Sequence, residues 1–329
     1  MARQARRTSP ATATAPVGLV GDIGGTNARF ALVQPDGTLA RVRVLATDDY
    51  PTIADAIAFY FAKFPDERPD QAVLAIAAPV TGDQISMTNH PWRFSIEALR
   101  GALALRRLRV INDFVANALA VPRLAPAERQ QVGCGTALAD APIGILGPGS
   151  GLGVSALVRS AETWVPIQGE GGHVTMAPAD ARESEVLDLM RRRYDHVSAE
   201  RVLCGAGLVN LYNALCEIDG VRAAPLTAAQ VTDPRTEAED PHARAATEMF
   251  CAMLGTVAGN LALTLGAQGG IYIAGGIVPR LGAAFAESSF RARFEAKGRF
   301  RDYLAAIPTF VITRSEPALL GAASLLDPA

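Results

Sequence analysis

Lysine is scarce in this sequence. Lys63 and Lys297 are the two lysines among 31 basic residues. Neither follows a glycine-rich loop or lies in a strand of the V-A-I-K type, so the sequence disfavours a P-loop NTPase, a protein kinase and an enzyme that forms a Schiff base on lysine. Phosphate chemistry in this chain must therefore use backbone N–H groups, arginine and a metal ion.

A basic excess is also missing, because 31 lysine and arginine residues face 33 aspartate and glutamate residues. Nucleic acid is therefore not an expected partner. The four cysteines stand far apart without a CxxC pair, which favours reduced core thiols over structural zinc. We find no apolar run of the ~18 residues that a membrane helix needs, and residues 1–16 lack a signal-peptide pattern. We expect a cytoplasmic protein without a membrane partner, and a disordered tail over residues 1–16.

The length and apolar content, 329 residues and 49% hydrophobic, suffice for about two domains of roughly 150 residues each. Apolar runs at residues 17–23, 28–33 and 39–45, separated by glycine-containing turns, predict a three-stranded antiparallel meander. The pattern of strand, glycine turn and strand recurs at residues 142–158, which is a weak sign of internal duplication. Apolar residues at helical spacing predict that the later half is mostly helical.

The first glycine turn is the strongest local signal. Glycines 24 and 25 let a hairpin expose consecutive N–H groups to an anion, Thr26 adds a donor, and Asp22 at the strand end can hold Mg²⁺ through water. The alternative is an ordinary hairpin with a Gly-Gly turn. Short glycine motifs often match by chance, so the spacing alone leaves both interpretations open.

A second glycine-rich turn covers residues 147–153. It contains a formal G-x-G-x-x-A at residues 151–156, so a dinucleotide site must be considered. The dinucleotide fingerprint continues into a helix, whereas residues 154–158 are strand-like. We therefore interpret this segment as a second phosphate-binding hairpin.

Four polar residues stand at positions suited to chemistry. Asp113 lies where an apolar strand meets a helix, so it is either a general base at the carboxyl end of the strand or a helix N-cap. Glu170 and His173 share a glycine-rich loop, for which metal binding is the competing interpretation, although HExxH spacing is absent. Glu200 follows Ser198 early in an expected helix, where the helix dipole alone would explain a carboxylate.

These segments together resemble the bacterial glucokinase family, which comprises ATP-dependent hexose kinases of the actin, chaperone-ATPase and hexokinase superfamily. The resemblance covers residues 17–326 and rests on a set of motifs in order. They are LVGDIGGTNAR at 19–29, MTNHPW at 87–92, INDF at 111–114, GEGGH at 169–173, VSAERVL at 197–203, GLVNLY at 207–212 and IAGGIVPR at 273–280. The chain departs from the family pattern at Pro148 and Ser150 and in its N-terminal extension.

The resemblance implies a two-domain actin-like ATPase (ribonuclease H-like) α/β fold. A small α/β domain (residues 17–123 and 314–329) and a larger one (residues 124–313) would surround a cleft. It also implies ATP-dependent phosphorylation of D-glucose to glucose-6-phosphate and a homodimer. A kinase for another hexose or an amino sugar, and a non-catalytic sugar-sensing regulator, are the alternatives. Related ROK kinases carry a cysteine-rich zinc motif, but residues 174–178 have no cysteine, so no zinc is expected.

The same resemblance implies the site residues. Asp113 matches the catalytic base, and the sugar ligands match Asn112, Asp113, Glu170, His173 and Glu200. The residues expected to hold ATP are Gly21, Asp22, Ile23, Gly24, Gly25, Thr26, Gly149, Gly151, Gly153, Gly275 and Gly276, with Asp22 also near Mg²⁺. We expect the sugar ligands to form a set separate from the phosphate hairpins.

Overall fold

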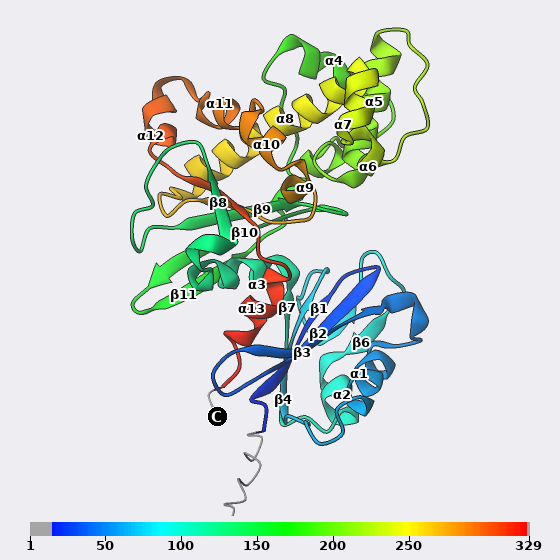
Figure 1. The fold of residues 1–329 in the computed structure, drawn as a ribbon, viewed down its shortest axis with the longest axis vertical. Helices are drawn as coiled ribbons and strands as arrows, with labels where there is room; N and C mark the ends of the chain where they lie inside the picture. The colour runs from blue at the N-terminus through cyan, green and yellow to red at the C-terminus, as the bar shows by residue number, and fades with distance from the viewer. Residues whose placement is uncertain (1–14, 328–329) are drawn as a thin grey trace, which may run out of the picture. The chain divides into compact units, whose positions relative to one another are not determined.

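The computed structural model describes residues 15–327. The chain divides into two compact units (Figure 1): a first unit of residues 1–113 with 322–329, and a second unit of residues 114–321. These divisions fall about ten residues before the domain boundary expected at 123/124 and about eight residues after the one expected at 313/314. The predicted tail, residues 1–16, lies almost wholly outside the described residues.

The first unit is built on a five-stranded sheet with the order β3-β2-β1-β4-β7. Strands β1, β2 and β3 form an antiparallel meander, and β4 and β7 continue the sheet parallel to β1. The strands are β1 (Gly18–Ile23), β2 (Asn27–Val33), β3 (Leu39–Ala46), β4 (Gln71–Ile76) and β7 (Arg107–Asn112), with a small hairpin of β5 (Gln84–Ser86) and β6 (Arg93–Ser95). The predicted meander is confirmed.

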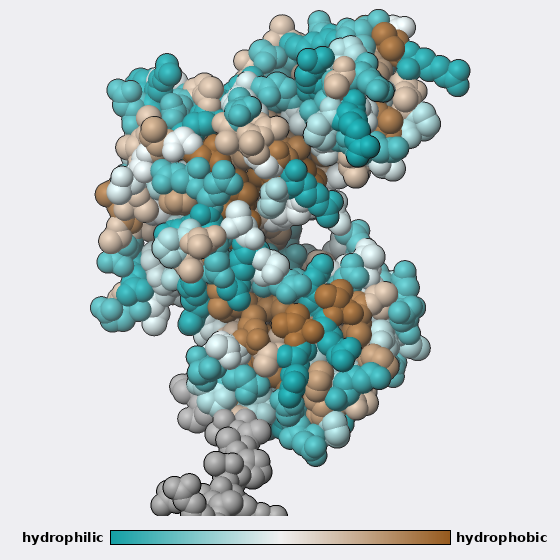
Figure 2. Space-filling view, in the orientation of Figure 1, coloured by the Kyte–Doolittle hydropathy of each residue, from teal (hydrophilic) through white to brown (hydrophobic). Residues whose placement is uncertain are grey.

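Helices α1 (Ile53–Ala62) and α2 (Ile96–Ala102) contribute to the same apolar core as the sheet (Figure 1). Thr52 and Asp55 form a capping box that begins α1, because each side chain accepts a hydrogen bond from the other residue's N–H group. Strand β4 is buried along its whole length, as expected for a central parallel strand. Figure 2 shows hydrophobic residues, in brown, on the visible face of this unit.

The second unit repeats this topology and adds β8, antiparallel to β13, at one edge of its sheet. Its sheet has the order β11-β10-β9-β12-β13-β8, in which β9, β10 and β11 form a meander while β12 and β13 run parallel to β9. The strands are β8 (Arg129–Val132), β9 (Ile143–Pro148), β10 (Leu152–Ser160), β11 (Thr163–Gln168), β12 (Ile271–Ile273) and β13 (Thr309–Ile312). The predicted internal duplication is therefore present in the strand order of the two sheets.

Helices supply the rest of the second unit. They are α4 (Ala181–Arg191), α5 (Gly205–Ile218), α6 (Ala228–Val231), α7 (Pro234–Glu239), α8 (Pro241–Leu265), α9 (Val278–Leu281), α10 (Ala283–Glu287), α11 (Phe290–Glu295) and α12 (Arg301–Ala305). Two more helices, α3 (Asp113–Ala120) and α13 (Pro317–Ala323), each have residues in both units. Asp240 caps α8 by accepting from the N–H groups of His242 and Ala243, and Gly266 ends it in the left-handed conformation.

Helix α8 is long and apolar enough to cross a membrane by length and composition, with a mean hydropathy of 1.4 over its apolar window. The expectation that no such segment exists is wrong by these two measures. However, 67% of the window is buried inside the structure, and α8 packs against α5 and α11. This burial is typical of a core helix.

Candidate functional site

The first glycine turn joins β1 to β2 at the carboxyl end of β1. The N–H group of Gly24 donates to the carbonyl oxygen of Asn27 at 2.9 Å and closes the turn. A Cβ atom at position 25 would lie 2.8 Å from the main-chain oxygen of Asn89, so only glycine fits there. Gly21 and Ile23 are buried in the sheet, so they can offer a ligand main-chain atoms alone.

Asp22 lies beside this turn and pairs across the ladder with Arg29. Its Oδ2 atom is 3.5 Å from Nη1 of Arg29, and its side chain is 20% exposed. Among residues 15–327, no group of three or more His, Cys, Asp or Glu side chains is arranged to hold a metal ion. Mg²⁺ usually keeps several waters and takes one or two carboxylates together with substrate phosphates. A single carboxylate at Asp22 fits that requirement.

Asn112 and Asp113 stand at the same edge of the first sheet. Ile23, Ile76 and Asn112 are register partners at the ends of the parallel strands β1, β4 and β7. Neighbouring strands lie about 4.8 Å apart, so the two outer strand ends are about 10 Å apart. The amide nitrogen Nδ2 of Asn112 donates to the carbonyl oxygen of Ala78 at 3.3 Å, and α3 begins at Asp113 itself. The first unit thus places Asp113 and the first glycine turn on one edge.

The second glycine turn joins β9 to β10. The N–H group of Gly149 donates to the oxygen of Gly151 at 2.8 Å, and Gly205 at the start of α5 donates to the oxygen of Gly149 at 2.9 Å. The chain continues from Leu152 as strand β10 rather than as a helix. The helix that the dinucleotide fingerprint requires is therefore absent at residues 152–160, and the strand-turn-strand geometry of the predicted hairpin is confirmed, while its binding of phosphate stays a prediction.

Glu200 lies directly against this turn. Its Oε2 atom accepts a hydrogen bond from the N–H group of Leu152 at 2.8 Å, and a Cβ atom at position 151 would come within 2.5 Å of the same oxygen. The expected helix is a single 3₁₀ turn, Ala199–Arg201, in which Ser198 makes no capping bond. The expected separation of the sugar ligands from the phosphate hairpins is therefore wrong for Glu200.

Three other segments of the second unit meet the same turn. The ring of Phe114 occupies the space beside residues 147 and 153, where added Cβ atoms would lie 2.8 and 1.8 Å from it. Gly275 has a φ of +83°, and a Cβ atom added to it would lie 2.3 Å from the carbonyl oxygen of Pro148. An added Cβ at Gly172 would lie 2.0 Å from the oxygen of Leu152. No local sequence pattern predicts that Phe114 contacts Gly147 and Gly153 or that Leu152 contacts Gly172.

Glu170 and His173 belong to the loop that carries Gly172. The N–H group of His173 donates to the oxygen of Glu170 at 2.9 Å, and this bond closes the 3₁₀ turn Gly171–His173. Both side chains are exposed. The second unit thus brings the side chain of Glu200 and the loop that carries Glu170 and His173 to the same turn.

Cys204 lies next to Glu200 but is not a candidate nucleophile. Its Sγ atom accepts a hydrogen bond from the N–H group of Gly207 at 3.3 Å and caps α5. Burial raises the pKa of this thiol, and the nearby carboxylate of Glu200 raises it further. A thiol with a raised pKa stays protonated near neutrality and is a poor nucleophile.

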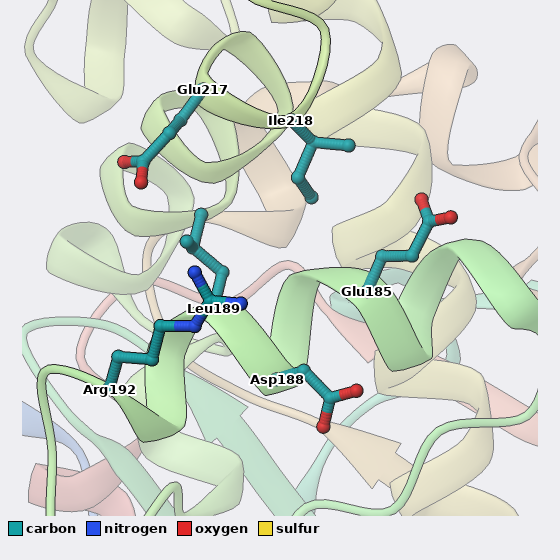
Figure 3. A pocket seen from close by; sticks show the side chains of 6 residues that line it. All are labelled: Glu185, Asp188, Leu189, Arg192, Glu217 and Ile218. Carbon is teal, nitrogen blue, oxygen red and sulfur yellow. The ribbon is translucent and has the colours of Figure 1, made fainter.

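A hollow of about 430 Å³ lies elsewhere on the second unit, between α4 and α5 (Figure 3). Its lining consists of Glu185, Asp188, Leu189, Arg192, Glu217 and Ile218. None of the predicted site residues lines it, and its three carboxylates pair with Arg182, Arg191 and Arg193. We therefore assign it no part in the candidate site.

Each sheet joins a three-stranded meander to two parallel strands in the same order, with a glycine turn between the first two strands of the meander, and this arrangement defines the actin-like ATPase class of fold. The family model described as glucokinase matches residues 19–329. The chain belongs to the glucokinase family, which confirms the resemblance and the predicted fold class.

The curated relatives agree with this assignment. Glucokinase of Nitrobacter hamburgensis is 51% identical over 312 residues, covering 94% of this chain and 97% of the relative. Glucokinase of Paramagnetospirillum magneticum is 53% identical over 313 residues, with 94% and 98% covered. The bifunctional protein glk of Burkholderia pseudomallei is 52% identical, but the chain covers only 48% of its length.

The solved structures show the same fold. The crystal structure of glucokinase from an Antarctic psychrotroph is 36% identical with a TM-score of 0.85, covering 94% of this chain and 98% of that one. A ROK family glucokinase from Streptomyces griseus, in complex with glucose and AMPPNP, has a TM-score of 0.66 at 18% identity, with 94% and 98% covered. The second likeness shows the fold alone.

Proposed function

We propose that this protein transfers the γ-phosphoryl group of ATP to the 6-hydroxyl group of D-glucose. The observation that carries the proposal is membership of the glucokinase family, with relatives named glucokinase at 51% and 53% identity over 94% of the chain. Asp113 at the carboxyl edge of the first sheet and a glycine hairpin in each unit supply groups suited to this reaction.

Asp113 acts as the general base. A sugar hydroxyl is a poor nucleophile, so a carboxylate within hydrogen-bond reach accepts its proton as oxygen attacks the γ-phosphorus, a contribution of typically ~10²–10⁴-fold. Asn112, Glu170, His173 and Glu200 bind the sugar hydroxyls and orient the acceptor for in-line attack. Glu200 also holds the second hairpin through Leu152, so one side chain serves both substrates.

The hairpins at residues 21–26 and 149–153 bind the phosphates, and Gly275 with Gly276 lies near the adenosine. Main-chain N–H groups stabilise the charge that develops on the phosphoryl oxygens, without the need for a lysine. Asp22 would hold Mg²⁺ through water, and the bound ion would neutralise charge on the phosphates. Arg29 keeps the Asp22 carboxylate in place by the ion pair described above.

We further propose that the protein acts in the cytoplasm as a homodimer, without zinc and without a nucleic-acid or membrane partner. Size-exclusion chromatography with light scattering tests the dimer. The rival substrates are other hexoses and amino sugars, which would use the same hairpins and differ in the ligands of the sugar.

The deciding experiment is a coupled assay of glucose-6-phosphate formation with ATP and Mg²⁺. Parallel reactions with mannose, fructose and N-acetylglucosamine rank the acceptors by kcat/KM. We expect glucose to rank first. Higher kcat/KM for another sugar would reassign the substrate, and glucose binding without turnover on any sugar would support the sugar-sensing regulator.

A further inference from the structure

Thr47 is a fully buried polar residue directly after β3. Its hydroxyl group donates to the carbonyl oxygen of Gly25 at 2.9 Å, and its N–H group donates to the carbonyl oxygen of Thr26 at 3.0 Å. Two consecutive carbonyls of the first glycine turn are thus bound by one residue that none of the sequence motifs contains.

These two bonds determine the direction of the neighbouring N–H groups. In a trans peptide the C=O and N–H bonds point in opposite directions. With the oxygens of Gly25 and Thr26 turned toward Thr47, the N–H groups of Thr26 and Asn27 point away from it. Of these two groups, Asn27 belongs to β2 and pairs with Ala46 of β3, whereas among the described residues the N–H group of Thr26 makes no main-chain hydrogen bond. Thr47 therefore orients a main-chain donor that an anion can use.

The turn that contains Thr47 is contacted in addition by the loop that carries His90 and Trp92. Trp92 is buried, and its Nε1–H group donates to the oxygen of Tyr50 at 3.0 Å. Nε2 of His90 lies 3.3 Å from Oδ1 of Asp48, and the His90 side chain is only 4% exposed. The same loop brings Asn89 against Gly25. The MTNHPW motif, to which the proposed function gives no role, thus supports both Thr47 and the glycine turn.

We propose that Thr47, held by His90 and Trp92, is a positioning residue that orients the first hairpin toward the phosphates of the nucleotide. This inference rests on the proposed function, because it takes the hairpin as part of the ATP site. Thr47 touches neither substrate. Its effect is on binding of the phosphates, and adenosine, which lacks them, is insensitive to it.

The test compares Thr47→Val, which removes the donor and keeps the shape, with Thr47→Ser, which keeps the donor. Calorimetry gives the Kd of AMPPNP and of adenosine, and the coupled assay gives both KM values. Thr47→Val leaves the partly buried oxygen of Gly25 without its hydroxyl partner, and we expect a roughly 5- to 100-fold weaker Kd for AMPPNP. Adenosine binding and the KM for glucose should change less than about twofold, and Thr47→Ser should stay close to wild type.

Thr38→Val is the matched control. It removes a hydroxyl group that also donates within a turn, to Asp36 at 2.6 Å, at an exposed position, and it should leave every constant unchanged. If Thr47→Val does not fold, Trp92→Phe removes the donor to Tyr50 and should weaken AMPPNP binding several-fold without affecting adenosine.

Equal losses for AMPPNP and adenosine, unchanged AMPPNP binding, or a serine variant as impaired as the valine variant would each overturn the inference. The proposed function fails in a different way, namely by absence of glucose-6-phosphate in the wild-type reaction, and nucleotide binding can still be measured in that case.

Discussion

Replacement of Glu200 should affect both substrates, because its carboxylate holds the second hairpin as well as a proposed sugar hydroxyl. Glu200→Ala leaves the N–H group of Leu152, in a residue 4% exposed, without its acceptor. An unsatisfied buried donor costs about 1–3 kcal/mol, which corresponds to roughly 5- to 150-fold weaker nucleotide binding if the hairpin is needed for it. This loss should appear without any sugar present.

Glu200→Gln separates the two effects. The amide oxygen can still accept from Leu152, but a charge-assisted hydrogen bond becomes a neutral one, a difference of about 1 kcal/mol or roughly fivefold. We expect AMPPNP binding to weaken by about that factor and glucose binding to weaken more. Glu162→Gln is the control, because Glu162 is 97% exposed.

The assay is calorimetric titration of AMPPNP and of glucose, each alone, into the wild type and the three variants. The reasoning would be refuted by an alanine variant that binds AMPPNP as tightly as the wild type. That result would mean that the hairpin keeps its conformation without the carboxylate, or that it does not bind nucleotide.

Three further outcomes are expected. Asp113→Asn should keep glucose affinity within a few-fold and lower kcat by at least ~10²-fold in the coupled assay, because the amide lacks proton affinity; near-normal turnover would exclude the base role. Glu170→Gln and His173→Ala should weaken glucose binding and leave AMPPNP binding almost unchanged; loss of nucleotide binding would contradict this. Burial works to raise the pKa of the Asp240 carboxyl, but hydrogen bonds from Tyr212, His242 and Ala243 outweigh it, so the pKa lies below the ordinary 3.8. Ionised Asp240 therefore stabilises the fold above pH 3.8, and this stabilisation is lost as the pH falls through the lowered pKa. Asp240→Asn should lower the free energy of unfolding by about 1 kcal/mol near neutrality. Thermal unfolding should show that the difference in stability between the variant and the wild type vanishes in acid.

The strands next to the glycine turns could be predicted because their signals are local. Apolar runs bounded by glycine or proline turns identify β1, β2, β9 and β10 within two residues of the observed ends. Strands β8 and β11 are edge strands with weak signals, because β8 has no apolar run and the short apolar run of β11 contains Pro166, which argues against a strand. Strand β11 leaves Val165 and Ile167 exposed, and β8 consists of three polar residues and Val132. Their pairing depends on distant strands and not on their own composition.

The candidate site shows the same division between local and distant signals. Motifs predict which segments carry chemistry, yet the bond from Leu152 to Glu200 joins residues 48 positions apart. The bond from Thr47 to Gly25 joins residues 22 positions apart. Thr47 lies in no glycine motif, and its hydroxyl matters only because the meander brings the end of β3 beside the first turn. The Thr47 contact follows from strand register and the Glu200 contact from the packing of a 3₁₀ turn against β10, and the local sequence pattern specifies neither.

Three of the glycines expected at the nucleotide site, Gly25, Gly151 and Gly275, have no room for a side chain. A lysine at any of them would need space for a Cβ atom. At position 25 that atom would lie 2.8 Å from the oxygen of Asn89, at 151 it would lie 2.5 Å from Oε2 of Glu200, and at 275 it would lie 2.3 Å from the oxygen of Pro148. No side chain fits at these positions without displacing its neighbours. In the proposed site, contacts to the nucleotide from these three positions therefore come from the main chain, and the positive charge that a P-loop lysine supplies elsewhere must come from a metal ion beside Asp22 or from arginine.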